Sequence, residues 1–359
     1  MINFVFRRLL YGFLVLCGVV TIIFFLFNIL PGDPARMLVG QRSDISSVEA
    51  ITKDLGLDKP VAVQYLNFLN DLSPISFHNF KNTDSYWYFN KSDYGGVVQL
   101  IQISDGFLIL KSPYLRRSYQ SRRHVSEIIA EAFPKTLLLA SSSIIIAMLL
   151  GILLGIPAAL TKDSFLDRFL LVFSSFGMSI PSFFAAIIMA WLFAFVLADY
   201  TGLQMFGSLY TVDSYTGVKN IDLKNLILPA ITLGIRPLAI VVSLTRSSML
   251  DILSQDYIRT AKAKGLSGFS VVIIHGLRNA LNPVITTITG WFASLMAGAV
   301  FVEYVFDWKG IGVVIVDALE KYDLPVIMGS VLTISLVLIL VNIFVDIVYA
   351  ALDPRIRLS

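Results

Sequence analysis

Charged residues are scarce in this sequence, and cysteine is nearly absent. Only 15% of the 359 residues are charged whereas 56% are hydrophobic, and the mean hydropathy is +0.76. This composition excludes an ordinary soluble domain and is typical of an integral membrane protein. The single cysteine, Cys17, excludes an intrachain disulfide and a thiolate metal cluster. The formal charge of +3 is too small to indicate a nucleic-acid-binding protein.

Motifs for catalysis and for ATP binding are also missing. No Gly-Lys dipeptide occurs, so the chain cannot contain a phosphate-binding loop of the usual form. The three histidines, His78, His124 and His275, are far apart and lack the spacing of a metal site. Residues 141–143 are three serines, and no sequence pattern pairs them with a general base. They are interpreted as a small-residue patch for helix packing. We therefore expect a chain that is not an enzyme and that binds no metal or cofactor itself.

Six charge-poor runs are long enough to cross about 30 Å of hydrocarbon as helices. The first run is interpreted as a retained span and not as a signal peptide, because no small-residue cleavage site follows it. The sequence therefore predicts an all-α membrane protein with six transmembrane helices. The runs cover residues 9–30, 136–160, 169–198, 226–245, 283–302 and 325–345.

Lysine and arginine are unevenly distributed among the segments that join these runs. One side of the membrane holds the N-terminus, residues 161–168, residues 246–282 and the C-terminal tail. It carries eleven basic residues: Arg7, Arg8, Lys162, Arg168, Arg246, Arg259, Lys262, Lys264, Arg278, Arg355 and Arg357. The two short loops on the other side carry only four: Lys219, Lys224, Lys309 and Lys321. Because short cytoplasmic loops are enriched in basic residues, both termini are predicted to be cytoplasmic.

The long segment between the first two runs, residues 31–135, is external in this topology. One feature argues against that placement, because four arginines lie close to the second run: Arg116, Arg117, Arg122 and Arg123. The opposite topology would place eleven basic residues outside, so the external placement is kept. The predicted division is therefore 1–30 for the N-terminal end and first span, 31–135 for an external subdomain, 136–351 for a five-helix core, and 352–359 for a cytoplasmic tail.

Local patterns within this external segment predict a small folded subdomain. Residues 97–110 are the nearest candidate for a further span, but Gln99, Gln102 and Asp105 interrupt them. Together with the aromatic residues 86–89, they have strand character. Helix signals cover residues 46–55 and 62–72. Residues 73–113 make the segment unusually long, and no role is assigned to them.

The loop between the fourth and fifth runs, residues 246–282, contains the signals for a short basic helix. Asp256 is expected to cap a helix that starts at Tyr257, and Gly265 is suited to the left-handed conformation that ends it. Lys262 and Lys264 suit the negative end of the helix dipole. Such a helix either docks on a partner protein or lies on anionic lipid headgroups, and these signals favour neither.

The residues that follow predict a second helix. Ser267 or Gly268 is expected to open it, and it is expected to span residues 269–281. Asn282 and Pro283 would then lead into the fifth span.

Motifs along most of the chain give it a family resemblance. Residues 256–266, Asp-Tyr-Ile-Arg-Thr-Ala-Lys-Ala-Lys-Gly-Leu, and residues 275–280, His-Gly-Leu-Arg-Asn-Ala, resemble the coupling loop of ATP-binding-cassette (ABC) importer permeases of the dipeptide/oligopeptide/nickel family. Further matching segments are residues 30–34, 55–60, 298–303, 308–312 and 352–357. Each motif alone is weak, and their combination is highly specific.

The resemblance implies the type I ABC-importer permease fold in the bacterial inner membrane. It also implies that the chain forms a pathway for peptides or a related small solute. The expected partners are a second permease subunit, cytoplasmic ATPase subunits that use ATP and Mg, and an external solute-binding protein. The runner-up is a self-sufficient secondary transporter or channel driven by an ion gradient, although carboxylates are nearly missing from the spans.

In such permeases the coupling loop carries a Glu-Ala-Ala-x-x-x-Gly signature that docks on the ATPase. The positions here are Arg259, Thr260, Ala261 and Gly265, so the glutamate is absent. Arg259 or Lys262 is expected to make the charged contact. The resemblance thus implies these ATPase-coupling residues: Asp256, Tyr257, Arg259, Thr260, Ala261, Lys262, Lys264 and Gly265.

Arg236 is the one charge inside a predicted span. It costs about 2.5–3.5 kcal/mol near the middle of a membrane helix, and the eleven Leu, Ile and Val residues of residues 226–245 offset this at about 0.3–0.6 kcal/mol each. The arginine still needs a polar surrounding. It either faces the translocation path and donates to a peptide carboxylate or backbone, or it pairs with a partner subunit or extends to the membrane surface.

Overall fold

The computed structural model describes residues 2–29, 45–54, 56–81, 85, 87–90, 93–94, 96–103, 105–212 and 217–352. Two of the resembling motifs, residues 30–34 and most of residues 352–357, lie outside these ranges. Contacts divide the chain into two compact units. Unit 1 contains Met1–Phe13, Phe133–Val313 and Ile334–Ser359, and unit 2 contains Leu14–Ala132 and Val314–Thr333.

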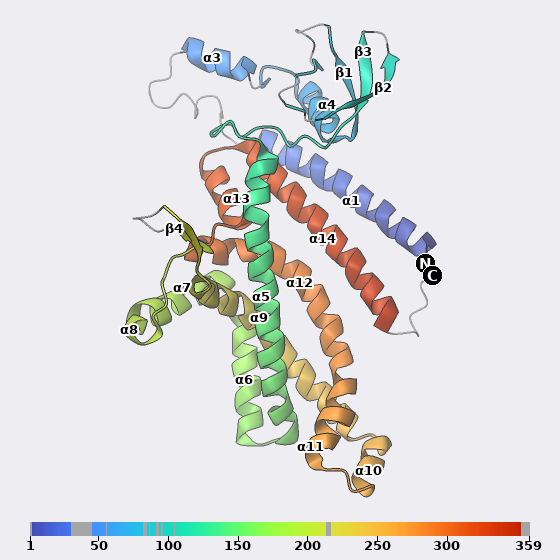
Figure 1. Cartoon of the computed structure of the whole chain (residues 1–359), viewed down its shortest axis with the longest axis vertical. Helices are drawn as coiled ribbons and strands as arrows, with labels where there is room; N and C mark the ends of the chain where they lie inside the picture. Colours follow the sequence, from blue (N-terminus) through green and yellow to red (C-terminus); the bar gives the residue numbers. More distant parts are fainter. Residues whose placement is uncertain are drawn as a thin grey trace. The chain divides into compact units, whose positions relative to one another are not determined.

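Helices form most of the described chain (Figure 1). Five of them are long and apolar enough to cross a membrane by themselves or with the turn before them. They agree with five of the predicted runs and extend beyond them: α1 (Ile2–Ile29), α5 (Val125–Leu160), α9 (Lys224–Leu253), α12 (Arg278–Phe306) and α14 (Leu324–Leu352). An all-α fold with apolar spans is therefore confirmed.

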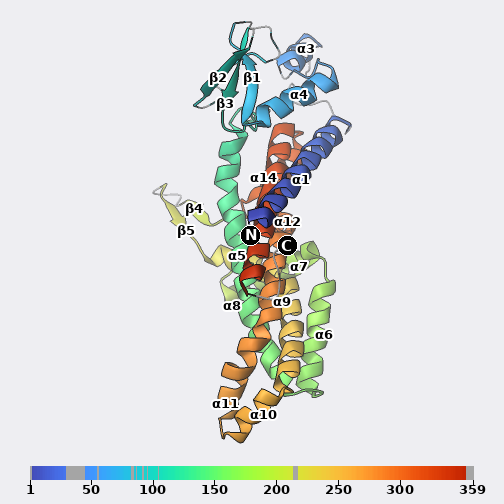
Figure 2. The same ribbon diagram turned by 90° about the vertical axis from the view of Figure 1, so that its right-hand side faces the viewer.

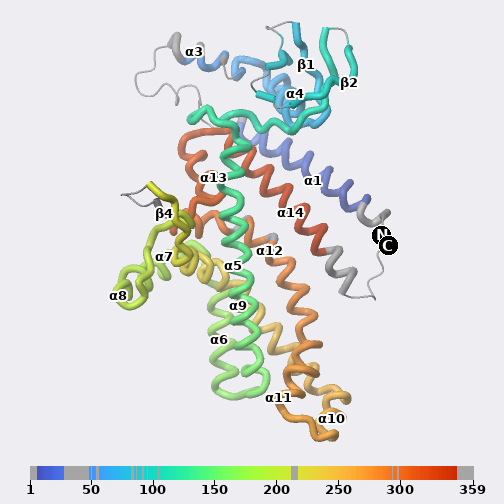
Figure 3. Tube along the Cα trace, in the orientation of Figure 1, coloured from blue at the N-terminus to red at the C-terminus, as the bar shows by residue number. Residues whose placement is uncertain are grey.

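The third predicted run is not one straight helix. It forms α6 (Phe165–Ser179), α7 (Ser182–Trp191) and a π-helix, η1 (Leu192–Val196), and the chain bends by 110° between α6 and α7 (Figure 3). Pro181 gives the reason, because the residue before a proline is pushed out of the helical conformation and Ile180 is extended. The described chain has six spans if this bent pair counts as one.

Within unit 1, α9 packs against α6, α7 and α12, and it passes very close to α5. A Cβ placed on Gly151 or Gly155 of α5 would lie 2.6 Å from side-chain atoms of Val241 or Thr245 on α9. This Gly-x-x-x-Gly spacing therefore allows the two helices to approach closely. Ser143 is fully buried and donates to the Leu139 carbonyl at 2.7 Å, which agrees with the packing interpretation of the three serines.

A buried turn closes unit 1 after α12. The Trp308 indole N–H donates to the Lys135 carbonyl at 3.0 Å, and the Ile311 N–H donates to the Thr136 hydroxyl at 2.8 Å. The Gly312 N–H donates to the buried Glu303 carboxylate at 2.7 Å. These bonds join the resembling segment 308–312 to the start of the second predicted span and to Glu303 of the other resembling segment, 298–303.

Several short elements of the core were not predicted. They are α8 (Ala198–Thr201), the hairpin of β4 (Tyr210–Val212) and β5 (Lys219–Ile221), and α13 (Ile311–Glu320). The Gly207 N–H donates to the Phe306 carbonyl at 3.0 Å. The segments that follow the third and the fifth runs therefore meet, which agrees with their predicted placement on the same side of the membrane.

Unit 2 contains a three-stranded antiparallel sheet of order β1-β3-β2 beside α4 (Figure 2). The strands are β1 (Ile75–Asn79), β2 (Val98–Ile103) and β3 (Gly106–Leu110), and the helices are α3 (Ile45–Asp54) and α4 (Val61–Leu72). The two predicted helices are confirmed, and residues 97–110 form a β-hairpin instead of a span. Sequence reasoning missed β1. Phe24, Phe68 and Met328 form part of an apolar core of this unit.

The arginines that argued against the external placement are mostly paired with carboxylates of unit 2. Arg116 pairs with Asp71 at 2.8 Å, Arg117 with Asp93 at 3.1 Å, and Arg123 with Glu131 at 2.5 Å. These pairs give the cluster a structural role in the folded segment. A folded segment of this length also translocates largely regardless of its charge, so the cluster does not decide the topology.

Candidate coupling site

The predicted short basic helix is present as α10 (Asp256–Ala263). It lies with α11 (Gly268–Ser270) at one end of unit 1, beyond the ends of α9 and α12 (Figures 1 and 2). The expected cap is wrong, because the helix begins at Asp256 itself and Gln255 occupies the capping position without a side-chain hydrogen bond. Asp256 instead pairs with Arg259 one turn later at 3.5 Å.

The end of α10 follows the prediction. Gly265 has a φ of +78°, which is the left-handed conformation that glycine adopts without strain. The Lys264 N–H donates to the Thr260 carbonyl at 3.0 Å. Ser267 then opens the next helix, and its hydroxyl accepts from the Ser270 N–H at 3.3 Å.

The second predicted helix, residues 269–281, is not a separate element. After α11 the chain forms a π-helix, η2 (Val271–Leu277), which continues directly into α12. Pro283 lies inside α12 and does not start it. The coupling loop is therefore joined to the fifth span through unbroken helix.

One face of α10 is anchored to the permease core. Ile258 is fully buried, and Ala261, three residues later on the same face, is 7% exposed. Both pack against Val271 of η2, with Ile252 and Leu253 of α9 beside them. In addition, the Asn279 side-chain amide donates to the Tyr257 hydroxyl at 3.1 Å. These contacts attach an eight-residue helix to the ends of both α9 and α12.

The opposite face of α10 is exposed and carries most of the predicted coupling residues. Asp256, Arg259, Thr260 and Lys262 are exposed, as are Lys264 and Gly265 beyond the helix end. Two apolar side chains extend this surface, because Leu266 is 41% and Phe269 is 77% exposed. Ala261 lies on the buried face, so its place in the structure is internal packing. Its contribution to docking stays a prediction, as do the docking roles of the exposed residues.

Arg236 lies in the middle of α9, which remains helical through Pro229 and Pro237. Its Nε atom is buried and has no hydrogen-bond partner in the described part of the chain. A buried donor without a partner costs about 1–3 kcal/mol or more when it carries charge. Arg236 as a whole is half-buried, so a contact from outside this chain would have to be made by the exposed part of its side chain.

A hollow on α12 adds polar groups within the membrane-spanning core. It is lined by Thr286, Thr287, Gly290, Trp291 and Ser294, which follow one another along one side of the helix. No group of three His, Cys, Asp or Glu side chains that could hold a metal occurs among the described residues. The arrangement is that of a row of polar groups on an otherwise apolar helix.

Comparison with protein families gives a match over more than half of the chain. Residues 151–358 match the family described as "Binding-protein-dependent transport system inner membrane component". This chain belongs to that family. Residues 1–84 match its companion, "Binding-prot-dependent transport system membrane comp, N-term".

Curated relatives cover this permease from end to end. It is 36% identical over 358 residues to the "Glutathione transport system permease protein GsiC" of Salmonella typhimurium, and it is 35% identical over 360 residues to the protein of the same name from Escherichia coli strain K12. Each match covers 99% of both chains. A solved structure, "Crystal structure of an amino acid ABC transporter with histidines", matches 63% of this chain and 94% of its own at 12% identity, with a TM-score of 0.41 that is too low to support an argument. The permease is thus a subunit of an ABC importer of the inner membrane.

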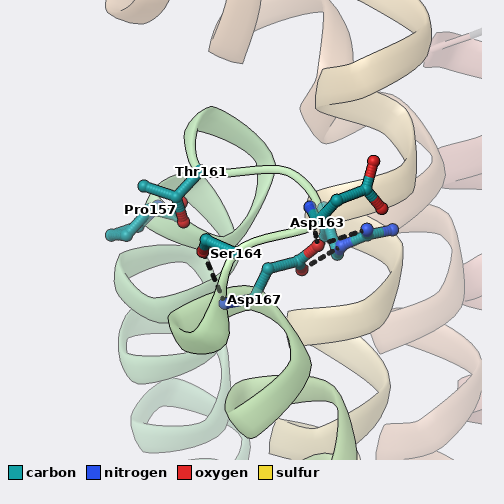
Figure 4. A network of polar contacts seen from close by, with 6 residues as sticks. Pro157, Thr161, Asp163, Ser164 and Asp167 are labelled. Carbon is teal, nitrogen blue, oxygen red and sulfur yellow. Dashed lines mark hydrogen bonds and ion pairs between the residues drawn. The ribbon is translucent and has the colours of Figure 1, made fainter.

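A polar network that sequence reasoning missed joins α6 to α9 in the permease (Figure 4). Arg246 forms a bidentate ion pair with Asp167 at 2.5 and 2.6 Å, and Asp167 is 1% exposed. The other Asp167 contacts are local, because it accepts from the Asp163 N–H at 2.9 Å and its own N–H donates to the Ser164 hydroxyl at 3.2 Å. The Ser164-x-x-Asp167 spacing is a capping-box signal that the sequence does show. The partner Arg246 is 79 residues away and gives no local signal.

Proposed function

We propose that this permease subunit helps to import a short peptide such as glutathione, and that α10 is its contact with a cytoplasmic ATPase. The substrate class is supported by the names of relatives that are 35–36% identical over nearly the whole chain. The docking role rests on one observation above all, the division of α10 into a buried anchoring face and an exposed basic face. A helix that merely rested on lipid headgroups would instead turn an apolar face outward.

The proposed mechanism follows from how α10 is attached. Because Ile258 and Tyr257 fix it to α9, η2 and α12, a displacement of α10 by an ATPase also moves the ends of two spans. The partner ATPases would use ATP and Mg and close on one another, and the two permease subunits would then switch between inward and outward access. An external solute-binding protein would deliver the solute. In this arrangement α10 and both termini are cytoplasmic.

We also propose that Arg236 contacts the solute. A guanidinium with an unpartnered buried Nε is suited to a peptide carboxylate or backbone carbonyl. The polar hollow on α12 is a second candidate part of the path. Arg236→Lys should retain part of the uptake and Arg236→Ala should lose it, with both variants inserted at normal levels. Normal uptake by Arg236→Ala would show that the arginine has another role.

The docking proposal is tested by purification in mild detergent from cells that produce the whole importer. The double variant Arg259→Glu with Lys262→Glu reverses the charge of the exposed face and leaves Ile258 in place. We expect the ATPase to be lost from this variant while the second permease subunit is retained. Lys162→Glu is the matched control, because it reverses an exposed lysine of the α5–α6 turn on the same predicted side. Retention of the ATPase by the double variant would contradict docking through this face.

The same preparation separates the proposal from the alternative of a secondary transporter. The purified chain is reconstituted alone and is given an ion gradient across the vesicle membrane. No uptake is expected without the ATPase and without ATP. Uptake driven by the gradient alone would overturn the importer mechanism.

A further inference from the structure

Unit 2 contains a cavity that the coupling mechanism does not use. It has a volume of about 480 Å³, within the usual range for small-molecule sites. Its wall includes Asn67 and Asp71 of α4, His78 of β1, and Tyr114 and Arg122 of the segment that precedes α5. The described residues that line it all belong to unit 2.

Positive charge dominates the wall of this cavity. It is lined by two carboxylates, Asp71 and Asp93, and by five cationic side chains: Lys53, Lys59, Arg116, Arg117 and Arg122. Both carboxylates already have partners. Asp71 accepts from Arg116 at 2.8 Å and from the Tyr94 hydroxyl at 2.9 Å, and Asp93 accepts from Arg117 at 3.1 Å. The cavity is therefore electrostatically suited to an anionic ligand.

Two buried polar atoms in the wall have no hydrogen-bond partner. His78 is 1% exposed, and its Nε2 lies 3.2 Å from the Ser76 hydroxyl, whereas its Nδ1 is unpartnered. The side-chain oxygen of Asn67 is also buried and unpartnered. Leaving such groups unpaired costs about 1–3 kcal/mol each. Because both atoms are buried, a ligand in the cavity reaches them only after a small movement of the wall. Burial and the nearby Lys111 lower the pKa of His78 to about 4, so the ring is neutral at physiological pH.

Aromatic and amide side chains complete the wall. Trp87, Tyr88, Tyr94 and Tyr114 supply ring surfaces, and Gln64 and Asn70 supply amides. Both amides already donate to backbone carbonyls, Asn70 to Phe77 and Gln64 to Leu57 and Lys59. An inorganic anion would therefore leave the ring surfaces without contacts. A molecule with a carboxylate and some apolar surface would use both the cationic side chains and the rings.

We propose that this cavity binds a small carboxylate-bearing molecule of di- or tripeptide size, with its carboxylate toward the cationic side chains and its amide groups toward His78 and Asn67. The site is separate from Arg236 and from the coupling helix. The proposal does not rest on the proposed import function, because binding here requires no ATPase, no solute-binding protein and no second permease subunit.

The test is equilibrium binding of radiolabelled Ala-Phe to the purified full-length chain in phosphatidylcholine nanodiscs, without ATP. We expect saturable binding, at least tenfold weaker binding of the C-terminal amide Ala-Phe-NH₂, and at least tenfold weaker binding to Arg122→Gln. Arg123→Gln is the matched control, because Arg123 is adjacent in sequence but pairs with Glu127 and Glu131 outside the cavity wall. It should bind as the unchanged chain does.

Further variants and a competing anion identify what the cavity binds. His78→Gln, which keeps a polar side chain, should also weaken binding, and both variants are checked for unchanged protection of β1 and β3 in hydrogen exchange. Binding that survives Arg122→Gln and His78→Gln but is lost in Arg236→Ala would belong to the translocation path and would overturn the proposal. Displacement by inorganic phosphate at the same concentration as by the peptide would show a general anion site and would overturn the carboxylate assignment. Absence of saturable binding would overturn the proposal outright.

Discussion

Replacing Ile258 by alanine should detach the coupling helix without unfolding the permease. Ile258 is the largest buried side chain of α10 and is fully buried against Ala261 and Val271. Removing a buried isoleucine side chain down to alanine costs about 2–5 kcal/mol. An eight-residue helix is only marginally stable by itself, so this cost falls on the docked state of α10. Since each 1.4 kcal/mol is a factor of ten, the detached population should rise about 30-fold or more.

Hydrogen exchange of residues 256–266 measures this detachment directly. Ile258→Ala should exchange at least about 30-fold faster over these residues, with unchanged protection in α5 and α9, and ATP-driven uptake should fall with it. Ile258→Val, which costs about 0.5–1.5 kcal/mol, should give an intermediate rate. Lys262→Ala changes an exposed side chain of the same helix and should leave exchange unchanged. Exchange in Ile258→Ala at the unchanged rate would refute the anchoring argument.

Three further predictions concern other parts of the chain. Burial lowers the pKa of His78 in the folded chain to about 4, below the ordinary 6.5. The neutral ring therefore contributes fully to stability above pH 6.5. This contribution is lost as the pH falls toward 4, by up to about 3 kcal/mol. Hydrogen exchange of β1 and β3 at pH 7 and pH 5, corrected for intrinsic rates, should show this loss, and His78→Gln should remove the pH dependence; an unaltered pH dependence in His78→Gln would assign it to another group. Asp167→Asn should weaken the α6–α9 contact by on the order of 2 kcal/mol, because it leaves the buried Arg246 partly unpaired, and the melting temperature in detergent should fall. The exchanged pair Asp167→Arg with Arg246→Asp should recover part of this loss. An unchanged melting temperature in either variant would contradict a structural role for the pair. Gly312→Ala should reduce the folded yield, because its Cβ would lie 2.5 Å from the Val300 Cα. Gly290→Ala is the control, since its Cβ would meet nothing within 4 Å and the variant should fold normally. Equal yields would show that the turn after α12 can relax.

The spans and the coupling helix were predictable because their signals are local. Apolar runs define α1, α5, α9, α12 and α14, and a basic segment that ends in Gly265 defines α10. The bend at Ile180 was also a local signal, since Pro181 follows it, but an apolar run hides a break that hydropathy does not register. The capping residue was predicted one position too late, at Asp256 and not at Gln255, which is within the one or two residues over which helix ends fray.

Features that depend on distant residues were not predictable from one sequence. The anchoring of Ile258 requires Val271, and the Asp167–Arg246 pair joins residues that are 79 positions apart. The strand β1 was missed because it is short, and its partner β3 lies about thirty residues later. Likewise, the pairing of Arg116 with Asp71 converts what looked like a topology signal into part of a folded unit.

The break between α6 and α7 has a consequence for what surrounds this chain in a bilayer. α6 has 15 residues and a length of about 22 Å, which is less than the roughly 30 Å thickness of the hydrocarbon. The non-helical backbone at Ile180 and Pro181 therefore cannot face lipid tails, since no group there could replace the missing helical hydrogen bonds. Ser179 and Pro181 are exposed in the single chain. In the membrane this corner must consequently be covered by another protein surface or wetted by water.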